Sequence, residues 1–74
     1  MEKIQIKTDD IQLDQLLKLA SIVESGGQVK YMIADELIKL NGNIVTERRR
    51  KIKPGDIVEV DGVGKLSVIK LKGE

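Results

Sequence analysis

The stretch LNGNIVTERRRKIKPGDIVEV, residues 40–60, contains the clearest fold signals in this sequence. Asn41-Gly42 stands between two short apolar segments, which is the strongest local indication of a two-residue hairpin turn. KPGD, residues 53–56, is a second turn, with proline at its second position. DIVEV then predicts a strand, DGVG another turn, and KLSVIK, residues 65–70, a last strand. The second half of the chain is therefore expected to form four short strands.

The first half of the chain has other periodicities. Ile4 and Ile6 alternate with polar residues and predict a short strand over residues 3–7. An amphipathic helix is predicted over residues 12–23, because apolar residues recur there at helical spacing: Leu13, Leu16, Leu17 and Ala20. The side chains of Thr8-Asp9-Asp10 are expected to end the strand and to cap this helix.

A second helix is predicted after ESGGQ, residues 24–28. Ser25 and Gln28 form an S-x-x-Q capping box, so the helix should begin near Gly26 and end near Ala34 or Asp35. Its apolar side would consist of Val29, Met32 and Ile33. The expected fold class is α+β, with two short packed helices against a small, mainly antiparallel sheet of four to five strands. Residues 71–74 are expected to fray.

Composition excludes several classes of function. A chain of 74 residues corresponds to one small domain with a modest core and little room for a deep cleft. It contains no cysteine and no histidine, which removes thiolate metal sites, the commonest zinc ligand and the commonest general base. Nucleophile, phosphate-loop and metal motifs are also missing, so we expect neither catalysis nor a metal, a cofactor or a small-molecule substrate. No long apolar run or signal peptide is present, which predicts a cytoplasmic protein without membrane contact.

The charges are segregated along the chain although the net charge is only +1. Residues 39–53 carry six basic residues against one acid, a net +5, and the rest carries seven basic and eleven acidic residues, a net −4. The basic residues of this segment are Lys39, Arg48, Arg49, Arg50, Lys51 and Lys53. A solvated loop that keeps a small sheet soluble would explain such a run. However, the run lies between two predicted strands and is rich in arginine, whose planar fork binds phosphate oxygens, so we favour a nucleic acid.

The loop SGGQ leaves two interpretations open. Its glycines could simply permit the reversal between the helices. Alternatively, backbone N–H groups at the start of the second helix could receive a phosphate, assisted by Lys30. The acids near the first helix, Asp9, Asp10 and Asp14, are ordinary for a helix start and do not indicate acid catalysis.

The order of these motifs resembles the S4-type RNA-binding domain. The matching stretches are QLDQLL at 12–17, SGGQVKYMIADELIKLNG at 25–42 and TERRRKIKPGDIVEV at 46–60, so the likeness covers about residues 13–60. The short length and ESGGQ are most similar to the small stand-alone S4-like proteins of bacteria, the YaaA/YbcJ type. The part from LNG to PGDIVEV is the more specific one. Gln12 and Gly26 stand where the family pattern has arginine, so the helix side of the site carries less charge here.

The resemblance implies the S4-like (αL motif) fold and RNA binding by a helix-loop-helix corner with a basic loop beside it. The helix-side positions would be Ser25, Gly26, Gln28 and Lys30, and the loop-side positions Arg48, Arg49, Arg50, Lys51 and Lys53. With one tyrosine and no other aromatic residue, base stacking should be minor. We expect a monomer that binds structured RNA, ribosomal or transfer RNA being candidates. The alternatives are a protein-interaction module whose arginine loop binds an acidic partner and a DNA-contacting accessory protein.

Overall fold

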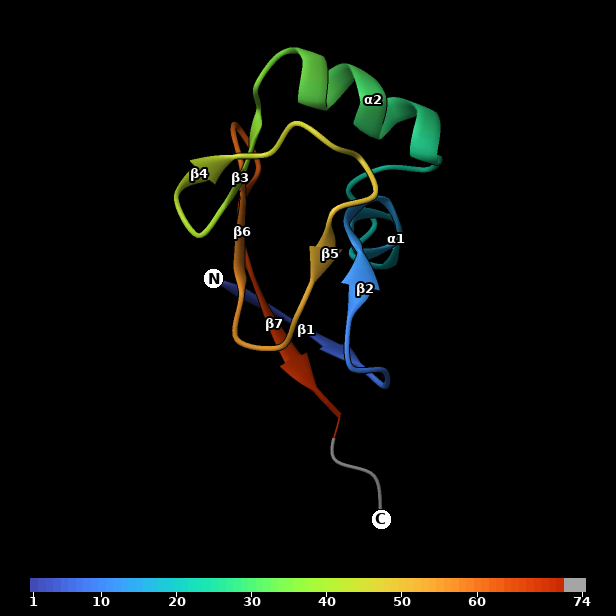
Figure 1. The fold of residues 1–74 in the computed structure, drawn as a ribbon, viewed down its shortest axis with the longest axis vertical. Helices are drawn as coiled ribbons and strands as arrows, with labels where there is room; N and C mark the ends of the chain where they lie inside the picture. The colour runs from blue at the N-terminus through green and yellow to red at the C-terminus, as the bar shows by residue number, and fades with distance from the viewer. Residues whose placement is uncertain (72–74) are drawn as a thin grey trace.

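The computed structural model describes residues 1–71 and contains two helices and seven strands in that part of the chain (Figure 1). In chain order these are β1 (Glu2–Ile6), β2 (Ile11–Gln12), α1 (Leu13–Leu19), α2 (Gly26–Ala34), β3 (Ile38–Leu40), β4 (Asn43–Ile44), β5 (Lys51–Ile52), β6 (Ile57–Val60) and β7 (Gly64–Lys70). The predicted α+β class is confirmed.

Five strands form one sheet in the order β1-β7-β6-β3-β4. The pairs β7–β6, β6–β3 and β3–β4 are antiparallel, and only β1–β7 is parallel, so the predicted sheet of four to five mainly antiparallel strands is confirmed. The parallel pair needs a long crossover, which the two helices and the later strands provide. β2 and β5 form a separate two-stranded ribbon, antiparallel, beside α1 (Figure 1).

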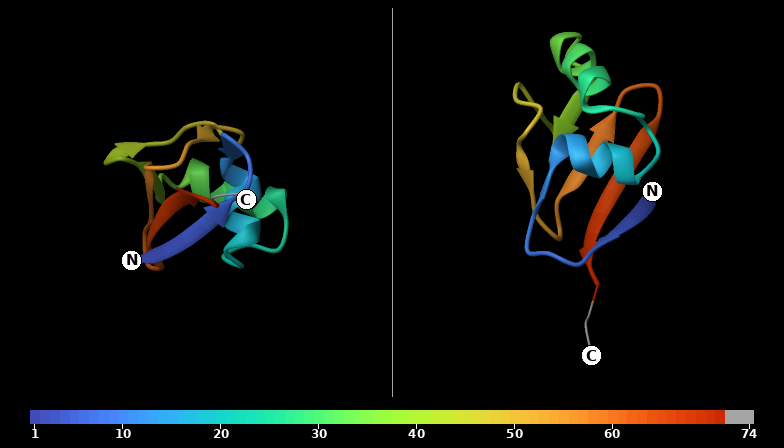
Figure 2. Two further views of the ribbon diagram at one scale, coloured as in Figure 1. Left: turned by 90° about the horizontal axis from the view of Figure 1, so that it is seen from below. Right: turned by 90° about the vertical axis from the view of Figure 1, so that its right-hand side faces the viewer.

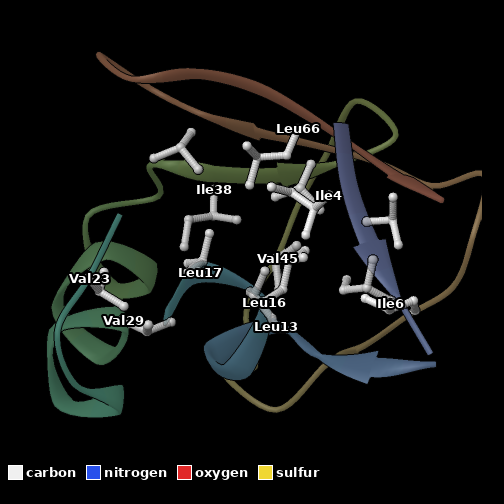
Figure 3. Close-up of a cluster of buried hydrophobic side chains, with 14 residues drawn as sticks. Ile4, Ile6, Leu13, Leu16, Leu17, Val23, Val29, Ile38, Val45 and Leu66 are labelled. Carbon is white, nitrogen blue, oxygen red and sulfur yellow. The ribbon is translucent and has the colours of Figure 1, made fainter. Parts of the chain in front are cut away.

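The core is aliphatic and lies between the sheet and the helices (Figure 3). Leu13, Leu16 and Leu17 of α1 are fully buried, which confirms the helical periodicity. Val29 of α2 is also fully buried, while Met32 and Ile33 are half-buried at the core's margin. The strands β1, β3, β6 and β7 contribute alternate residues, among them Ile4, Ile6, Ile38, Val58, Val60, Leu66 and Val68.

The two turns that the sequence predicts are joined to each other by side-chain hydrogen bonds. Asn41 and Gly42 both have positive φ, 50° and 88°, as a two-residue hairpin between β3 and β4 requires. The Asn41 side chain accepts a hydrogen bond from the Ile57 N–H at 2.9 Å and donates one to Asp56 at 3.1 Å. Asp56 in turn accepts one from the Lys53 N–H at 2.8 Å. The Asn-Gly and Pro-Gly-Asp turns therefore stabilise each other, although twelve residues separate Gly42 from Gly55.

The first helix is shorter than predicted. It ends at Leu19 instead of residue 23, because Ser21 adopts the left-handed conformation, with φ 61°. The N–H groups of Ser21 and Ile22 donate to the carbonyls of Lys18 and Leu17, which is the Schellman pattern of a helix C-terminus. Glycine usually occupies the left-handed position of this pattern, and a serine there gave no sequence signal.

The second helix agrees with the prediction at both ends. It runs from Gly26 to Ala34, and the Gln28 side chain accepts hydrogen bonds from the N–H groups of Glu24 and Ser25, as a capping box requires. It also ends in a Schellman pattern, with Glu36 at φ 59°. Gly26 and Gly27 are its first two residues and neither has a positive φ, so the reversal between the helices does not depend on glycine conformations.

Two further expectations need correction. Thr8-Asp9-Asp10 does not cap α1, whose N-cap is Gln12 and which has no side-chain cap. The two short strands β2 and β5 were also missing from the prediction. β2 precedes α1, and β5 raises the number of strands after the helices from four to five. Fraying was expected for residues 71–74. Residues 72–74 lie outside the described part, and the Leu71 N–H donates to the carbonyl of Ile6 at 2.7 Å.

Candidate nucleic-acid interface

The arginine segment, residues 45–50, connects β4 to β5. Its backbone is hydrogen-bonded to the start of α1. The Leu13 N–H donates to the carbonyl of Arg50 at 2.8 Å, and the Asp14 N–H donates to the carbonyl of Arg48 at 3.0 Å. The first N–H groups of a helix have no partner within the helix, and here the loop supplies carbonyl oxygens in place of a capping side chain. The positive end of the α1 dipole also favours these oxygens. The loop thus replaces the cap that the sequence analysis assigned to Thr8-Asp9-Asp10.

The ribbon formed by β2 and β5 continues this attachment. Ile11 pairs with Ile52, and Gln12 pairs with Lys51. Ile52 is fully buried while Lys51 is exposed, so the segment is held by one apolar side chain and leaves its cations outside. The arginine segment is therefore an ordered connection between β4 and β5, and it and β5 are anchored to four consecutive residues, 11–14, of β2 and α1.

The arginine side chains are exposed. Arg48, Arg49 and Arg50 all lie on the surface, and Arg48 and Arg49 occupy a turn whose ends are joined by a hydrogen bond from the Arg50 N–H to the Glu47 carbonyl at 3.2 Å. Within residues 1–71, the ion pair closer than 4 Å is the one between Lys70 and Asp9, and it lies away from this segment. The guanidinium groups are consequently available to an external anion.

The structure brings one helix-side residue next to the loop. Lys30 of α2 and Arg48 of the loop line the same open depression of about 360 Å³, together with Ile33 and Thr46. In Figure 2, the connection between β4 and β5 passes beside α1 while α2 lies across the end of the molecule. Two cations from segments 18 residues apart in the sequence thus share one concave surface.

Asp14 lies between the arginine segment and the start of α2. Its N–H contacts the loop through Arg48, and its carboxylate lies on the side of Gly26, where an added Cβ would stand 3.4 Å from the Asp14 Oδ2. This is ordinary van der Waals contact, so a side chain at position 26 fits beside the Asp14 carboxylate. Position 26 and the arginine segment are therefore neighbours through Asp14. From the sequence, Asp14 was expected to be an ordinary helix-start acid, and no local pattern predicts this bridging position.

The remaining predicted residues lie at the margins of this surface. Ser25 is the exposed N-cap of α2. The side-chain oxygen of Gln28 already accepts the two hydrogen bonds of the capping box. Arg50 lines a smaller depression of about 160 Å³ on the β4 side with Asn41 and Thr46. Lys53 is exposed at the Pro-Gly-Asp turn, at the opposite end of β5 from the depression that Lys30 lines. Thr46 lines both depressions and gave no sequence signal.

No group of three or more acidic side chains with the arrangement of a metal site occurs within residues 1–71. None of the helices in the described range is long and apolar enough to cross a membrane.

Comparison with known proteins agrees with this architecture. The family model of the S4 domain matches residues 4–69. The chain belongs to the S4 domain family, and the match extends beyond the stretch 13–60 that carries the resemblance in the sequence. The resemblance and the S4-like fold are thus confirmed.

Two of the relatives are small proteins of similar length. The "Probable ribosome maturation protein RlbA" of Bacillus subtilis (strain 168) is 38% identical over 66 residues, which cover 89% of this chain and 93% of the relative. The "Putative RNA-binding protein YbcJ" of Escherichia coli (strain K12) is 39% identical over 56 residues, covering 76% and 80% of the two chains. The chain also resembles 17% of the tyrosine–tRNA ligase of Nitrosomonas europaea, at 33% identity over 70 residues.

Proposed function

We propose that this protein binds structured RNA without catalysing a reaction, through the arginine segment and the N-terminal part of α2. Ribosomal RNA is the preferred candidate, transfer RNA the second, and we propose a cytoplasmic monomer. The names of the two small relatives, a ribosome maturation protein and an RNA-binding protein, support this assignment. The similarity covers 93% and 80% of these two relatives.

The observation that carries the proposal is the pair of hydrogen bonds from Leu13 and Asp14 to the loop carbonyls. These bonds turn the backbone oxygens of Arg48 and Arg50 toward α1 and leave three exposed arginines on an ordered backbone. A mobile basic loop would lose conformational entropy on binding, whereas an anchored one has already lost much of it on folding. Affinity for a polyanion would follow from the release of counterions that phosphates hold.

The shape of the surface favours a structured RNA. Lys30 and Arg48 both line one open depression, so they would contact phosphates of a folded backbone more readily than bases inside a duplex. Double-stranded RNA is recognised mainly by shape and by contacts to phosphates and 2′-hydroxyls. Ser25 and Gly26, at the start of α2, would complete the helix side of the interface. Lys51 would extend the side formed by the arginine segment.

Crosslinking in living cells tests the proposal. Ultraviolet light would be applied to cells that express the tagged protein, followed by purification under denaturing conditions and sequencing of the attached nucleic acid. We expect covalently bound RNA enriched in ribosomal or transfer RNA, with crosslinked peptides from residues 46–53 and 25–31. Recovery of DNA, or of a single acidic protein that survives nuclease treatment without any RNA, would refute it.

A further inference from the structure

Tyr31 is the chain's one aromatic residue, and it is not part of the core. Its side chain is 74% exposed on α2. Other large apolar side chains are also exposed, among them Val63 at 61% and Leu19 at 56%. Single exposed apolar residues are normal in soluble proteins, so exposure alone assigns nothing. What distinguishes Tyr31 is the surface on which it lies.

The position of Tyr31 follows from the packing of α2. Val29 is buried, and Met32 and Ile33 are half-buried, so these three residues define the side of the helix that faces the core. Consecutive residues of a helix are about 100° apart around its axis, so Lys30 stands at the edge of this side, where it lines the depression with Ile33, and the exposed Tyr31 projects from the opposite side. Tyr31 does not line the depression, but it directly follows the lysine that shares it with Arg48, and the two Cα atoms are about 3.8 Å apart.

An RNA backbone held by Lys30 and Arg48 would bring its own nucleotides within reach of this ring. Aromatic side chains stack on exposed bases of every type, because each base has a π face. Bases within a duplex are already stacked on their neighbours, so a ring on the outside of a helix can use only a bulged, looped or terminal base. The phenol also has a rigid shape with few rotatable bonds, which keeps the entropy cost of the contact low.

We propose that Tyr31 stacks on a single unpaired base that lies next to the helical part of the RNA bound by Lys30 and the arginine segment. This inference rests on the proposed function and makes it more specific: the RNA has an irregularity within one or two nucleotides of the phosphates that the protein holds. One stacking position agrees with the expectation that stacking is minor, and it gives the otherwise shape-dependent interface a means of selecting a site.

Two RNA hairpins of the same stem sequence test the inference, one with a single-nucleotide bulge and one fully paired. Both carry a fluorescent label at one end, and their binding is followed by anisotropy for the parent, Tyr31→Ala, Tyr31→Leu and Tyr31→Phe. Val63→Ala is the matched control, because it removes a similarly exposed apolar side chain from the turn between β6 and β7. Since the variants change exposed residues, their circular dichroism spectra and melting temperatures should equal those of the parent.

We expect Tyr31→Ala to weaken binding of the bulged hairpin about tenfold and binding of the paired hairpin less than twofold. Tyr31→Phe should keep the parent's affinity, and Tyr31→Leu should resemble Tyr31→Ala, because an aliphatic group of similar exposure lacks the π face. The dependence of binding on salt should be the same in all four proteins, since no phosphate contact is lost. Val63→Ala should bind as the parent does.

Nuclear magnetic resonance provides a direct readout. Because the chain contains one tyrosine and no phenylalanine or tryptophan, the ring signals of the labelled protein belong to Tyr31. We expect them to shift upfield on addition of the bulged hairpin and to move little with the paired one. Binding of both hairpins with unmoved ring signals and an unaltered Tyr31→Ala affinity would overturn this inference alone. If the parent bound neither hairpin, both this inference and the proposed function would be overturned.

Discussion

Residues 40–60 contain two groups of polar side chains with opposite structural roles. Asn41 and Asp56 lie in the two turns, and the Asn41 amide donates a hydrogen bond to Asp56. Asn41 also accepts one from the Ile57 N–H, and Asp56 accepts one from the Lys53 N–H of its own turn. Arg48, Arg49 and Arg50 lie between these turns, are exposed and have no ion-pair partner within residues 1–71. The turn residues thus determine the shape of the segment, and the arginines are free for an external partner. The turn residues, which are the most recognisable part of the pattern, are consequently structural. The positive charge is carried by the arginines, whose side chains are the least constrained.

The largest effect on RNA binding is expected from removing the three arginine side chains. Replacing Arg48, Arg49 and Arg50 by alanine should leave the melting temperature unchanged, because their side chains are exposed and form no ion pair within residues 1–71. Binding to RNA should weaken on the order of a hundredfold at physiological salt, and the slope of log K against log salt should fall by about two to three units. Salt titrations of the parent and the variant against total cellular RNA measure this slope.

A control variant that loses the same number of positive charges distinguishes the effect of the loop from the effect of net charge. Replacing Lys3, Lys7 and Lys65 by alanine also removes three positive charges, but these lysines are exposed on or next to β1 and β7. This variant should lose less than one unit of slope. Equal losses in the two variants would mean that the loop has no special role.

The second effect concerns the turn residues. Asn41→Ala removes two side-chain hydrogen bonds and leaves alanine at φ 50°, so we expect the free energy of unfolding to fall by about 2 kcal/mol. Urea denaturation measures it. Asn43→Ala, at the exposed end of the same turn, is the control and should change stability by less than about 0.5 kcal/mol. At temperatures where Asn41→Ala is folded, its salt slope should equal that of the parent. A reduced slope with an unchanged stability would reverse the roles that we assign to the two groups.

A smaller effect is expected at position 26, where the family pattern has arginine. Gly26→Arg should be accommodated beside Asp14, since the added Cβ meets only ordinary contact there. It should tighten RNA binding by about 0.5–1.5 kcal/mol, comparable to one charge-assisted hydrogen bond or less. Gly27→Arg adds the same charge one residue later and is the control, because position 27 faces Ser25 instead of Asp14. Equal or absent gains in the two variants would exclude this corner from the interface.

The smallest effect concerns an exposed charged pair far from both groups. The hydrogen bond from Lys70 at 2.6 Å, together with its charge, lowers the pKa of Asp9 below 3.8. A lowered folded-state pKa stabilises the protein above pH 3.8, and this contribution is lost as the pH falls through the folded-state pKa. A carboxyl titration followed by nuclear magnetic resonance should therefore give a midpoint below 3.8, and Lys70→Ala should raise it. Because both side chains are exposed, the same substitution should barely change the melting temperature. A midpoint at or above 3.8 in the parent would show that the pair is not formed.

The sequence predicted those parts of the fold that local signals determine. The Asn-Gly hairpin, the capping box of Ser25 and Gln28, and the alternation in β1, β6 and β7 depend on residues close to one another, and all were confirmed. The end of α1 was missed because Ser21 takes a conformation that usually indicates glycine. The start of α1 was assigned to the wrong cap, because its true partners are carbonyls about 35 residues away in the chain. Partners of this kind depend on tertiary structure and leave no local pattern.

The same distinction applies to the candidate site. The cations of the loop were visible as a run of charge, and Lys30 was found through its place in the second helix. Their meeting at one depression could not be deduced, because it depends on how α2 lies relative to the loop. Asp14 and Thr46 are common residue types in ordinary positions, so their contacts with the site become visible only in the structure. Which of the predicted residues touch RNA stays a prediction.

The most direct measurement of the central claim keeps every charge and changes only its geometry. Replacing Arg48, Arg49 and Arg50 by lysine removes the planar fork that pairs with two fixed oxygens at once. If the loop binds an RNA backbone mainly through counterion release, the lysine variant should keep most of its affinity for total cellular RNA and nearly all of the parent's salt slope. A pull-down from RNase-treated lysate with the same two proteins should then recover no specific partner. A protein that survives RNase with the parent and is lost with the lysine variant would contradict the account and identify the loop as a protein-binding surface.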